Sequence, residues 1–339
     1  MNMFPLVRRL LPLLLGTIAI VARGGDLGPP DEAQLRAATT RSLGFLQKQG
    51  DKWMNERTCN SCHAMPMLLW SNRMGRERGI PIDDKVYDEV VDWSYERAKK
   101  DTQGASEVGA FLRLAMPEKP VPELATLLAG KQQADGSWKV GGQFESMQRR
   151  DAHEAKGNTM RVALLALAMP DVDASVADAA RTKAQALLAQ DETPKSVETL
   201  AFRTLYSRHF GPPEESVALR AELLKLQHTD GGWSWMMGEA QSDCLATGEV
   251  LYVLQSAADP SAVEAIGRGR RWLLDQQRED GGWSIDFTRI SKLDRSGEAK
   301  AKSLKDATFI YTLWGSAWAT IGLLEGLPIA NKPAVTAAP

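Results

Sequence analysis

The sequence has little cysteine, little histidine and almost no net charge. Its three cysteines are too few for the disulfide framework of a small secreted domain. Its 41 basic and 43 acidic side chains nearly cancel and are scattered along the chain. Because nucleic acid is bound by a clustered basic surface, we expect no nucleic acid partner.

The start of the chain has the pattern of a secretory signal. Arg8 and Arg9 form a basic region, and the apolar stretch 10–22 is too short to span a bilayer comfortably. We predict a signal peptide over residues 1–25 and an exported, periplasmic or otherwise extracytoplasmic protein. An uncleaved anchor is the alternative, because no clean cleavage pattern follows Ala22. We expect no transmembrane domain in the mature chain.

A short motif recurs three times at fixed internal spacing. Glutamine precedes tryptophan by six residues, with Asp-Gly between them, in Gln132–Trp138, Gln227–Trp233 and Gln277–Trp283. A weaker copy, Gln47–Trp53, has glycine before aspartate. Asp-Gly is typical of a tight turn with positive φ, so we expect each glutamine to end a helix and each tryptophan to pack against neighbouring helices.

Helical patterns of two kinds alternate between these motifs. The segment 261–277 is amphipathic, as expected of an outer helix, whereas 158–169, 245–254 and 307–324 are apolar or small on all sides. Pairing them gives about six hairpins, at 33–79, 84–116, 121–169, 174–209, 213–258 and 261–326. The predicted fold class is all-α: one α/α toroid over residues 26–327, followed by a disordered tail at 328–339.

The repeated glutamine-tryptophan motifs resemble those of the squalene cyclase and prenyltransferase repeat superfamily, in particular an exported subgroup with a CxxCH motif in its first hairpin. This resemblance implies an α/α toroid. It leaves the enzyme question open, because the Asp-x-Asp-Asp acid motif of hopene cyclases is incomplete at 171–174, which looks like a turn and helix cap. The zinc ligands of prenyltransferases are also missing, since Asp243 and Cys244 are adjacent and no histidine follows His228.

Cys59, Cys62 and His63 form the CxxCH motif, which is the signature of covalent c-type haem. In this interpretation the two thiols bind the haem and His63 ligates its iron. Met74, Met147 and His153 are candidate distal ligands. A local disulfide, a zinc site and a packed helix start are the alternatives.

Asn158, Asp243 and Asp306 are the candidate catalytic residues. They lie near the expected starts of inner helices and would form a polar mouth on the toroid, although helix capping is the preferred interpretation of the two acids. A second titratable cluster lies just before Asn158 and comprises Asp151, His153 and Glu154.

These observations together predict an exported repeat protein that carries haem and acts in electron transfer or in redox or ligand binding. Its partner would be a redox protein or an apolar small molecule. A terpenoid- or lipid-processing enzyme with a central apolar cavity is one alternative, and a non-catalytic interaction scaffold is the other.

Overall fold

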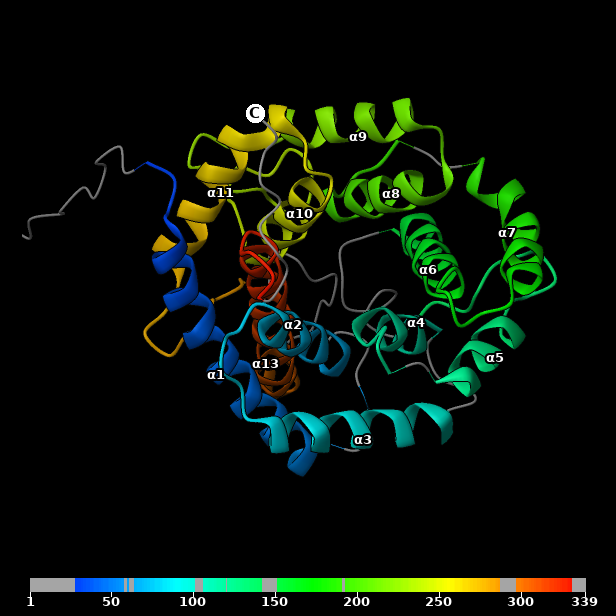
Figure 1. The fold of residues 1–339 in the computed structure, drawn as a ribbon, viewed down its shortest axis with the longest axis horizontal. Coiled ribbons are helices and arrows are strands. Elements are labelled where there is room, and N and C mark those ends of the chain that lie inside the picture. The colour runs from blue at the N-terminus through cyan, green and yellow to red at the C-terminus, as the bar shows by residue number, and fades with distance from the viewer. Residues whose placement is uncertain are drawn as a thin grey trace, which may run out of the picture.

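The helices of the chain form two concentric rings (Figure 1). The computed structural model describes residues 28–57, 60, 64–100, 106–119, 121–141, 151–190, 193–286 and 297–330, except for some side chains near the start of α13. The outer helices in this part of the chain are α1 (Glu32–Glu56), α3 (Asp84–Lys100), α5 (Pro122–Gly130), α7 (Ala174–Leu188), α9 (Pro213–Lys225) and α11 (Val263–Gln276). The inner helices are α2 (Met65–Glu77), α4 (Ser106–Ala115), α6 (Ala152–Leu167), α8 (Val197–Phe210), α10 (Cys244–Ser256) and α13 (Gly297–Leu324).

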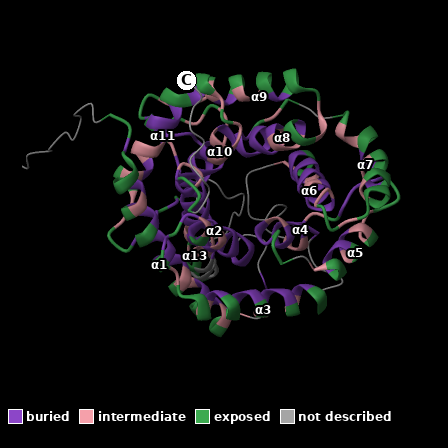
Figure 2. Cartoon of the chain, in the orientation of Figure 1, coloured by how far each residue is buried: buried purple, intermediate pink, exposed green. Residues whose placement is uncertain are grey.

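The predicted α/α toroid of six hairpins is confirmed, and the helix ends differ from the expected hairpin bounds by no more than two residues. Burial follows the two rings (Figure 2). Helix α11 buries a single face, whereas α10 is buried on nearly every side. The difference between amphipathic and uniformly apolar segments therefore assigned the helices to the correct ring.

The second half of α13, Ala307–Leu324, is long and apolar enough by length and composition to cross a membrane. The expectation of no transmembrane domain in the mature chain stays a prediction. Here 78% of the segment is buried inside the protein. A buried core helix can pass the same test of length and composition, because it too is surrounded by apolar side chains.

Each glutamine of the repeated motif joins two hairpins. Its side-chain amide donates one hydrogen bond to the glycine carbonyl of its own turn and one to the next outer helix. The second acceptors are the carbonyl oxygens of Ala180, Ala265 and Ala38, at 2.8, 2.8 and 2.9 Å from Gln132, Gln227 and Gln277. Because Ala38 belongs to the first helix, the bond from Gln277 closes the ring.

The tryptophan of each motif holds the turn against the helix that precedes it. The indole N–H groups of Trp138, Trp233 and Trp283 donate to the carbonyl oxygens of Leu128, Leu223 and Leu273, each at 2.8 Å. All three rings are buried. The expected packing role of the tryptophans is therefore confirmed.

The weaker copy of the motif does not form a turn. Gln47 and Trp53 lie within the uninterrupted helix α1, so that interpretation was wrong. Glycine precedes aspartate there and takes no positive φ. Instead Gly50 lets α2 approach α1, since a Cβ at this position would lie 2.5 Å from Cδ1 of Leu68.

The ends of the chain are described only in part. Residues 1–27 lie outside the described part, so the signal peptide and export stay predictions. At the other end, the N–H of Ala330 donates to the carbonyl oxygen of Glu77 at 2.8 Å. Residues 331–339 of the expected tail lie outside the described part.

Gly281 provides a test of how tightly the ring closes. Its φ is +90°, and a Cβ would lie 2.3 Å from the carbonyl oxygen of Arg41 in α1. Gly238 has a similar φ of +84° but nothing within 4 Å. We expect Gly238→Ala to lower the free energy of unfolding by about 1–2 kcal/mol through backbone strain alone. Gly281→Ala should cost about 1–3 kcal/mol more, because α1 must move.

Urea denaturation of both variants measures this difference. Equal losses for the two substitutions would show that the turn after α11 does not hold α1 at close range.

Candidate functional site

The inner helices all begin at one rim of the ring. Consecutive helices run in opposite directions, so the links from outer to inner helices share this rim, which we call the loop rim. These links include the long connections from α5 to α6, α9 to α10 and α11 to α13. The opposite rim carries mostly short turns. Functional residues on the loop rim therefore come from the first turns of inner helices and from the loops.

A cavity of about 350 Å³ lies among the inner helices, lined mostly by apolar side chains and also by Arg73, Arg208 and His209. All six inner helices contribute to its lining, mostly through residues in their second halves. Two aromatic groups flank it: Trp70, Tyr252 and Trp318 on one side, Phe111 and Phe202 on the other. Burial raises the pKa of Tyr252 to about 12.

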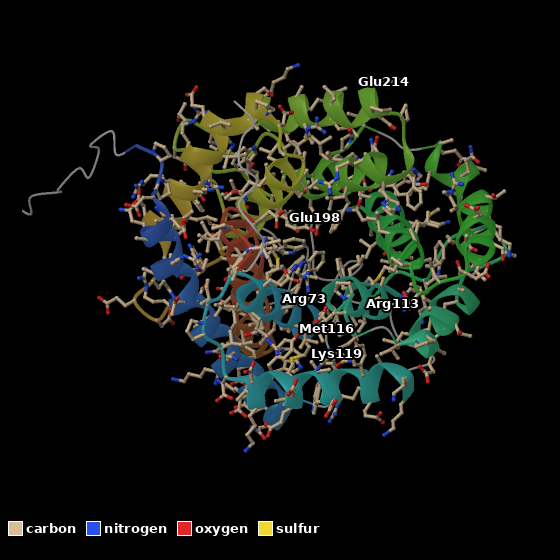
Figure 3. The ribbon with its side chains drawn as sticks, viewed as in Figure 1. Arg73, Arg113, Met116, Lys119, Glu198 and Glu214 are labelled. Atoms are coloured by element: carbon tan, nitrogen blue, oxygen red, sulfur yellow. The ribbon has the colours of Figure 1, made fainter. Side chains whose placement is uncertain are left out.

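Glu198 lies on the same face of α8 as two residues that line this cavity. Phe202 and Leu205 follow it by four and seven residues, which is the spacing of one helix face. Glu198 is fully buried, and Figure 3 shows it directed toward the centre of the ring. A carboxylate therefore faces the central space at the loop rim.

The same spacing places polar residues toward the centre on three neighbouring inner helices. Each precedes a cavity-lining residue by three or four positions: Glu107 before Phe111 in α4, Asn158 before Val162 in α6, and Glu249 before Tyr252 in α10. All three are buried. Buried acidic and amide side chains therefore face the centre near the loop rim, whereas aromatic and basic side chains line the cavity toward the opposite rim.

Neighbouring loops hold the start of α8 in place. Ser196 caps the helix through a hydrogen bond from the N–H of Thr199 at 3.2 Å. The N–H of Val197 donates to the carbonyl oxygen of Trp235 at 2.9 Å, so the loop before α10 crosses this helix end. Trp235, which is buried, therefore lies beside the backbone of Glu198.

Asn158 connects α6 to the same helix end. Its Nδ2 donates to Oγ1 of Thr199 at 3.0 Å, and its side chain is completely buried. Because Thr199 follows Glu198 directly, this hydrogen bond fixes the orientation of α8 at the acidic end of the central space. Asn158 is thus close to the site, in a positioning role.

Asp243 is occupied as a helix cap. One carboxylate oxygen accepts from the N–H of Ala246 at 2.8 Å, and the other from the N–H of Trp235 at 2.7 Å. Both bonds are buried, which supports the capping interpretation. The third candidate, Asp306, lies in α13 with its side chain outside the described part of the chain.

Glu154 is a structural acid. One of its oxygens accepts from the N–H groups of Lys195 and Ser196, at 2.7 and 3.2 Å. Asp151 in the same cluster is the N-cap of α6, through a hydrogen bond from the N–H of Glu154 at 2.8 Å. His153 is exposed. The titratable cluster predicted from the sequence therefore stabilises the start of α6 and the backbone that leads into α8.

The incomplete acid motif is a turn and a helix cap, as expected. Asp171 forms an ion pair with the buried Arg113 at 2.7 Å. Asp173 caps α7 by accepting from the N–H of Ser175 at 2.7 Å, and hydrogen bonds from Ser175 lower the pKa of this carboxyl.

Cys59, Cys62, His63 and Met147 lie outside the described residues, so haem attachment stays a prediction. The described candidates for a distal ligand are Met74, which is buried in α2, and His153, which is exposed. Among the residues that the structure describes, no group of three or more His, Cys, Asp or Glu side chains is placed to hold a metal ion.

No family model matches the chain, and no curated protein is similar to it in sequence. Solved structures match its fold. An unsaturated glucuronyl hydrolase from Bacillus sp. GL1, responsible for the degradation of glycosaminoglycan, has a TM-score of 0.55 at 16% identity, over 86% of this chain and 96% of its own. A possible member of the GH105 family from Salmonella enterica has a TM-score of 0.54 at 12% sequence identity, and the match covers 84% of this chain and 93% of that one. A wild-type glycosidase has a TM-score of 0.56 at 11% sequence identity, and the match covers 88% of this chain and 100% of that one.

These structures correct the expected family. The matching α/α toroids are glycosidases, so the expected membership in the squalene cyclase and prenyltransferase repeat superfamily was wrong. The physical reason is that the glutamine-tryptophan motif joins neighbouring hairpins, a requirement set by the ring rather than by its chemistry.

The expected function is corrected by the same finding. Glycosidase neighbours conflict with haem-based electron transfer and with a squalene cyclase or prenyltransferase type of enzyme. The CxxCH motif fixes only three residues of the chain, whereas the structural match extends over most of its length.

Asp243 and Asp173 provide a test of the buried cap. Asp243→Ala should lower the free energy of unfolding by about 2–4 kcal/mol, because it removes a helix cap and leaves the buried N–H of Trp235 without an acceptor. Asp173→Ala, at an exposed cap, should cost about 1 kcal/mol. Thermal unfolding checks both, and equal effects would contradict a buried double role for Asp243.

Proposed function

We propose that the chain is a glycoside hydrolase whose active site is the acidic end of the central space. The observation that carries this proposal is that three buried glutamates, Glu107, Glu198 and Glu249, face the centre from the first two turns of three inner helices. The glycosidase neighbours support it, because they share the toroid over most of their length.

Glycoside hydrolysis requires two carboxyl groups. One protonates the oxygen of the leaving group, and the other activates water or attacks the sugar at its anomeric carbon. Glu198 and Glu249 are the preferred pair, because α8 and α10 pack directly against each other. One oxygen of Glu107 already accepts a hydrogen bond from the N–H of Gly141 at 2.8 Å. Glu107 is therefore assigned to positioning the loop before α6.

Aromatic side chains accompany the carboxylates of the proposed site and would shield a bound sugar from bulk water. Trp235 and Tyr311 are both buried at the loop-rim end of the inner ring. Tyr311 precedes the cavity-lining Trp318 by seven residues, so both lie on the same face of α13. Aromatic faces beside carboxylates are suited to packing against sugar rings.

The decisive test is hydrolysis of defined glycosides by the purified full chain. The probes are a panel of nitrophenyl glycosides and an oligosaccharide that ends in an unsaturated glucuronyl residue, the group named for the Bacillus structure. Glu198→Gln and Glu249→Gln should each lower kcat about 100-fold or more, since the amide transfers no proton. Their melting temperatures should stay near that of the unchanged chain.

Glu214→Gln is the matched control. Glu214 is exposed on the outer helix α9, and Figure 3 shows it at the outer edge of the molecule. This variant should retain full activity. The proposed function would be disproved if the unchanged chain released no sugar from any probe, or if the Glu198→Gln variant hydrolysed a probe at the rate of the unchanged chain.

A further inference from the structure

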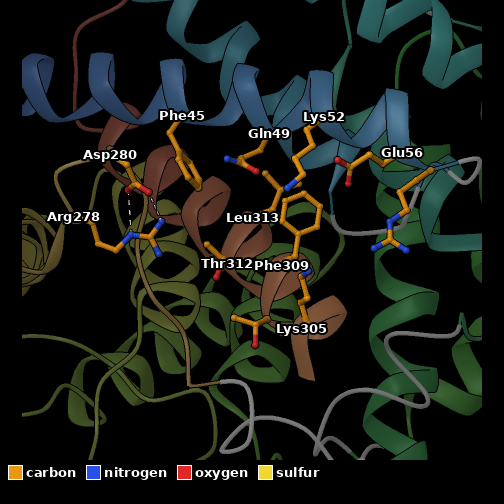
Figure 4. A pocket seen from close by; sticks show the side chains of 12 residues that line it. Phe45, Gln49, Lys52, Glu56, Arg278, Asp280, Lys305, Phe309, Thr312 and Leu313 are labelled. Carbon is orange, nitrogen blue, oxygen red and sulfur yellow. Dashed lines mark hydrogen bonds and ion pairs between the residues drawn. The ribbon is translucent and has the colours of Figure 1, made fainter. Parts of the chain in front are cut away.

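A groove of about 670 Å³ lies between α1 and α13, where the last hairpin meets the first. This α1–α13 groove is separate from the acidic end of the central space. Its residues on α13 include Lys305, Phe309 and Thr312, whereas Trp318, on another face of this helix, lines the central cavity. Figure 4 shows side chains of both helices reaching into the groove. Its volume is in the range of small-molecule sites.

Two lysines line this groove without a carboxylate partner among the described side chains. Lys52 on α1 and Lys305 on α13 are exposed, and neither forms an ion pair within the part of the chain that the structure describes. The ammonium group of Lys52 lies 5.1 Å from the ring centroid of Phe309, and Figure 4 shows the two lysines on either side of this ring. A negatively charged ligand is the missing partner for such a pair.

The remaining charges leave the groove positive. Arg278 forms an ion pair with Asp280 at 2.7 Å, so these two neutralise each other. Arg57 and Glu56 also line the groove and carry opposite charges. The groove lining thus carries four basic and two acidic side chains, a net excess of two positive charges.

Neutral hydrogen-bonding groups accompany the lysines. Gln49, Thr308 and Thr312 line the groove, and their side chains make no hydrogen bond to other described residues. Their amide and hydroxyl groups both donate and accept, which suits the hydroxyl groups of a sugar. The rings of Phe45 and Phe309 provide an apolar surface beside them.

We propose that the α1–α13 groove is a second glycan-binding site, selective for an oligosaccharide with carboxylate groups. Lys52 and Lys305 bind the carboxylates, while Gln49, Thr308 and Thr312 bind the hydroxyl groups. The choice of a sugar over another anion rests on the proposed function. The groove would hold a polymeric substrate at a distance from the carboxylates that cleave it.

Calorimetric titration of the Glu198→Gln chain tests this proposal without consuming the ligand. The probes are a tetramer of galacturonic acid, a neutral cellulose tetramer and polyglutamate. The acidic tetramer should bind, and the neutral tetramer should bind on the order of tenfold more weakly, with the affinity for the acidic tetramer falling as salt rises. Polyglutamate binding as tight as that of the acidic sugar would overturn sugar recognition.

Charge reversal locates the site. Lys52→Glu and Lys305→Glu should each weaken binding of the acidic tetramer on the order of tenfold, and together remove one bound tetramer per chain. Lys48→Glu is the control, because Lys48 is exposed on α1 but does not line the groove. Unchanged binding by Lys52→Glu and Lys305→Glu, or an equal loss in Lys48→Glu, would overturn the proposal.

The two proposals fail separately. If the protein hydrolyses nitrophenyl glycosides but binds no acidic tetramer, only the proposed binding site in the groove is wrong. If it binds the tetramer through Lys52 and Lys305 but hydrolyses no glycoside, only the proposed active site is wrong.

Discussion

The structure depends on hydrogen bonds between a glutamine side chain and the backbone of the next outer helix. Their carbonyl acceptors lie in helices, and the glutamines that reach them are only partly exposed. A helix carbonyl already bonded within its helix still has a second lone pair, so the amide joins two hairpins without breaking either. The bond from Gln277 to Ala38 closes the ring, and the inner helices then surround one central space.

Ring closure gives the central space two different ends. Inner helices begin at the loop rim, where Glu107, Glu198 and Glu249 lie within the first two turns. Their second halves carry the aromatic residues around the apolar cavity. Carboxylates near a helix start interact favourably with the N–H groups exposed there. This preference helps to explain how an apolar inner ring retains buried acids on one side only.

The closing point of the ring also differs from the other contacts between hairpins. There α13, the longest described helix, meets α1 and leaves the α1–α13 groove between them. The groove contains lysines, a glutamine and threonines, although apolar side chains fill the contacts elsewhere in the core. The glutamates that face the central space and the lysines that line the groove thus lie on opposite sides of the inner helix α13.

The sequence by itself determined the fold class, the hairpin bounds and the assignment of helices to the rings, because helix periodicity and Asp-Gly turns depend on neighbours along the chain. It also marked Asn158 and Asp243 near the right rim. Only the tertiary structure decided that Asp243 is a cap and that Glu198 and Glu249 face the centre. A glutamate in an apolar helix looks the same in sequence whether it points outward or inward. Its direction is set by residues on other hairpins, distant along the chain, that pack around it.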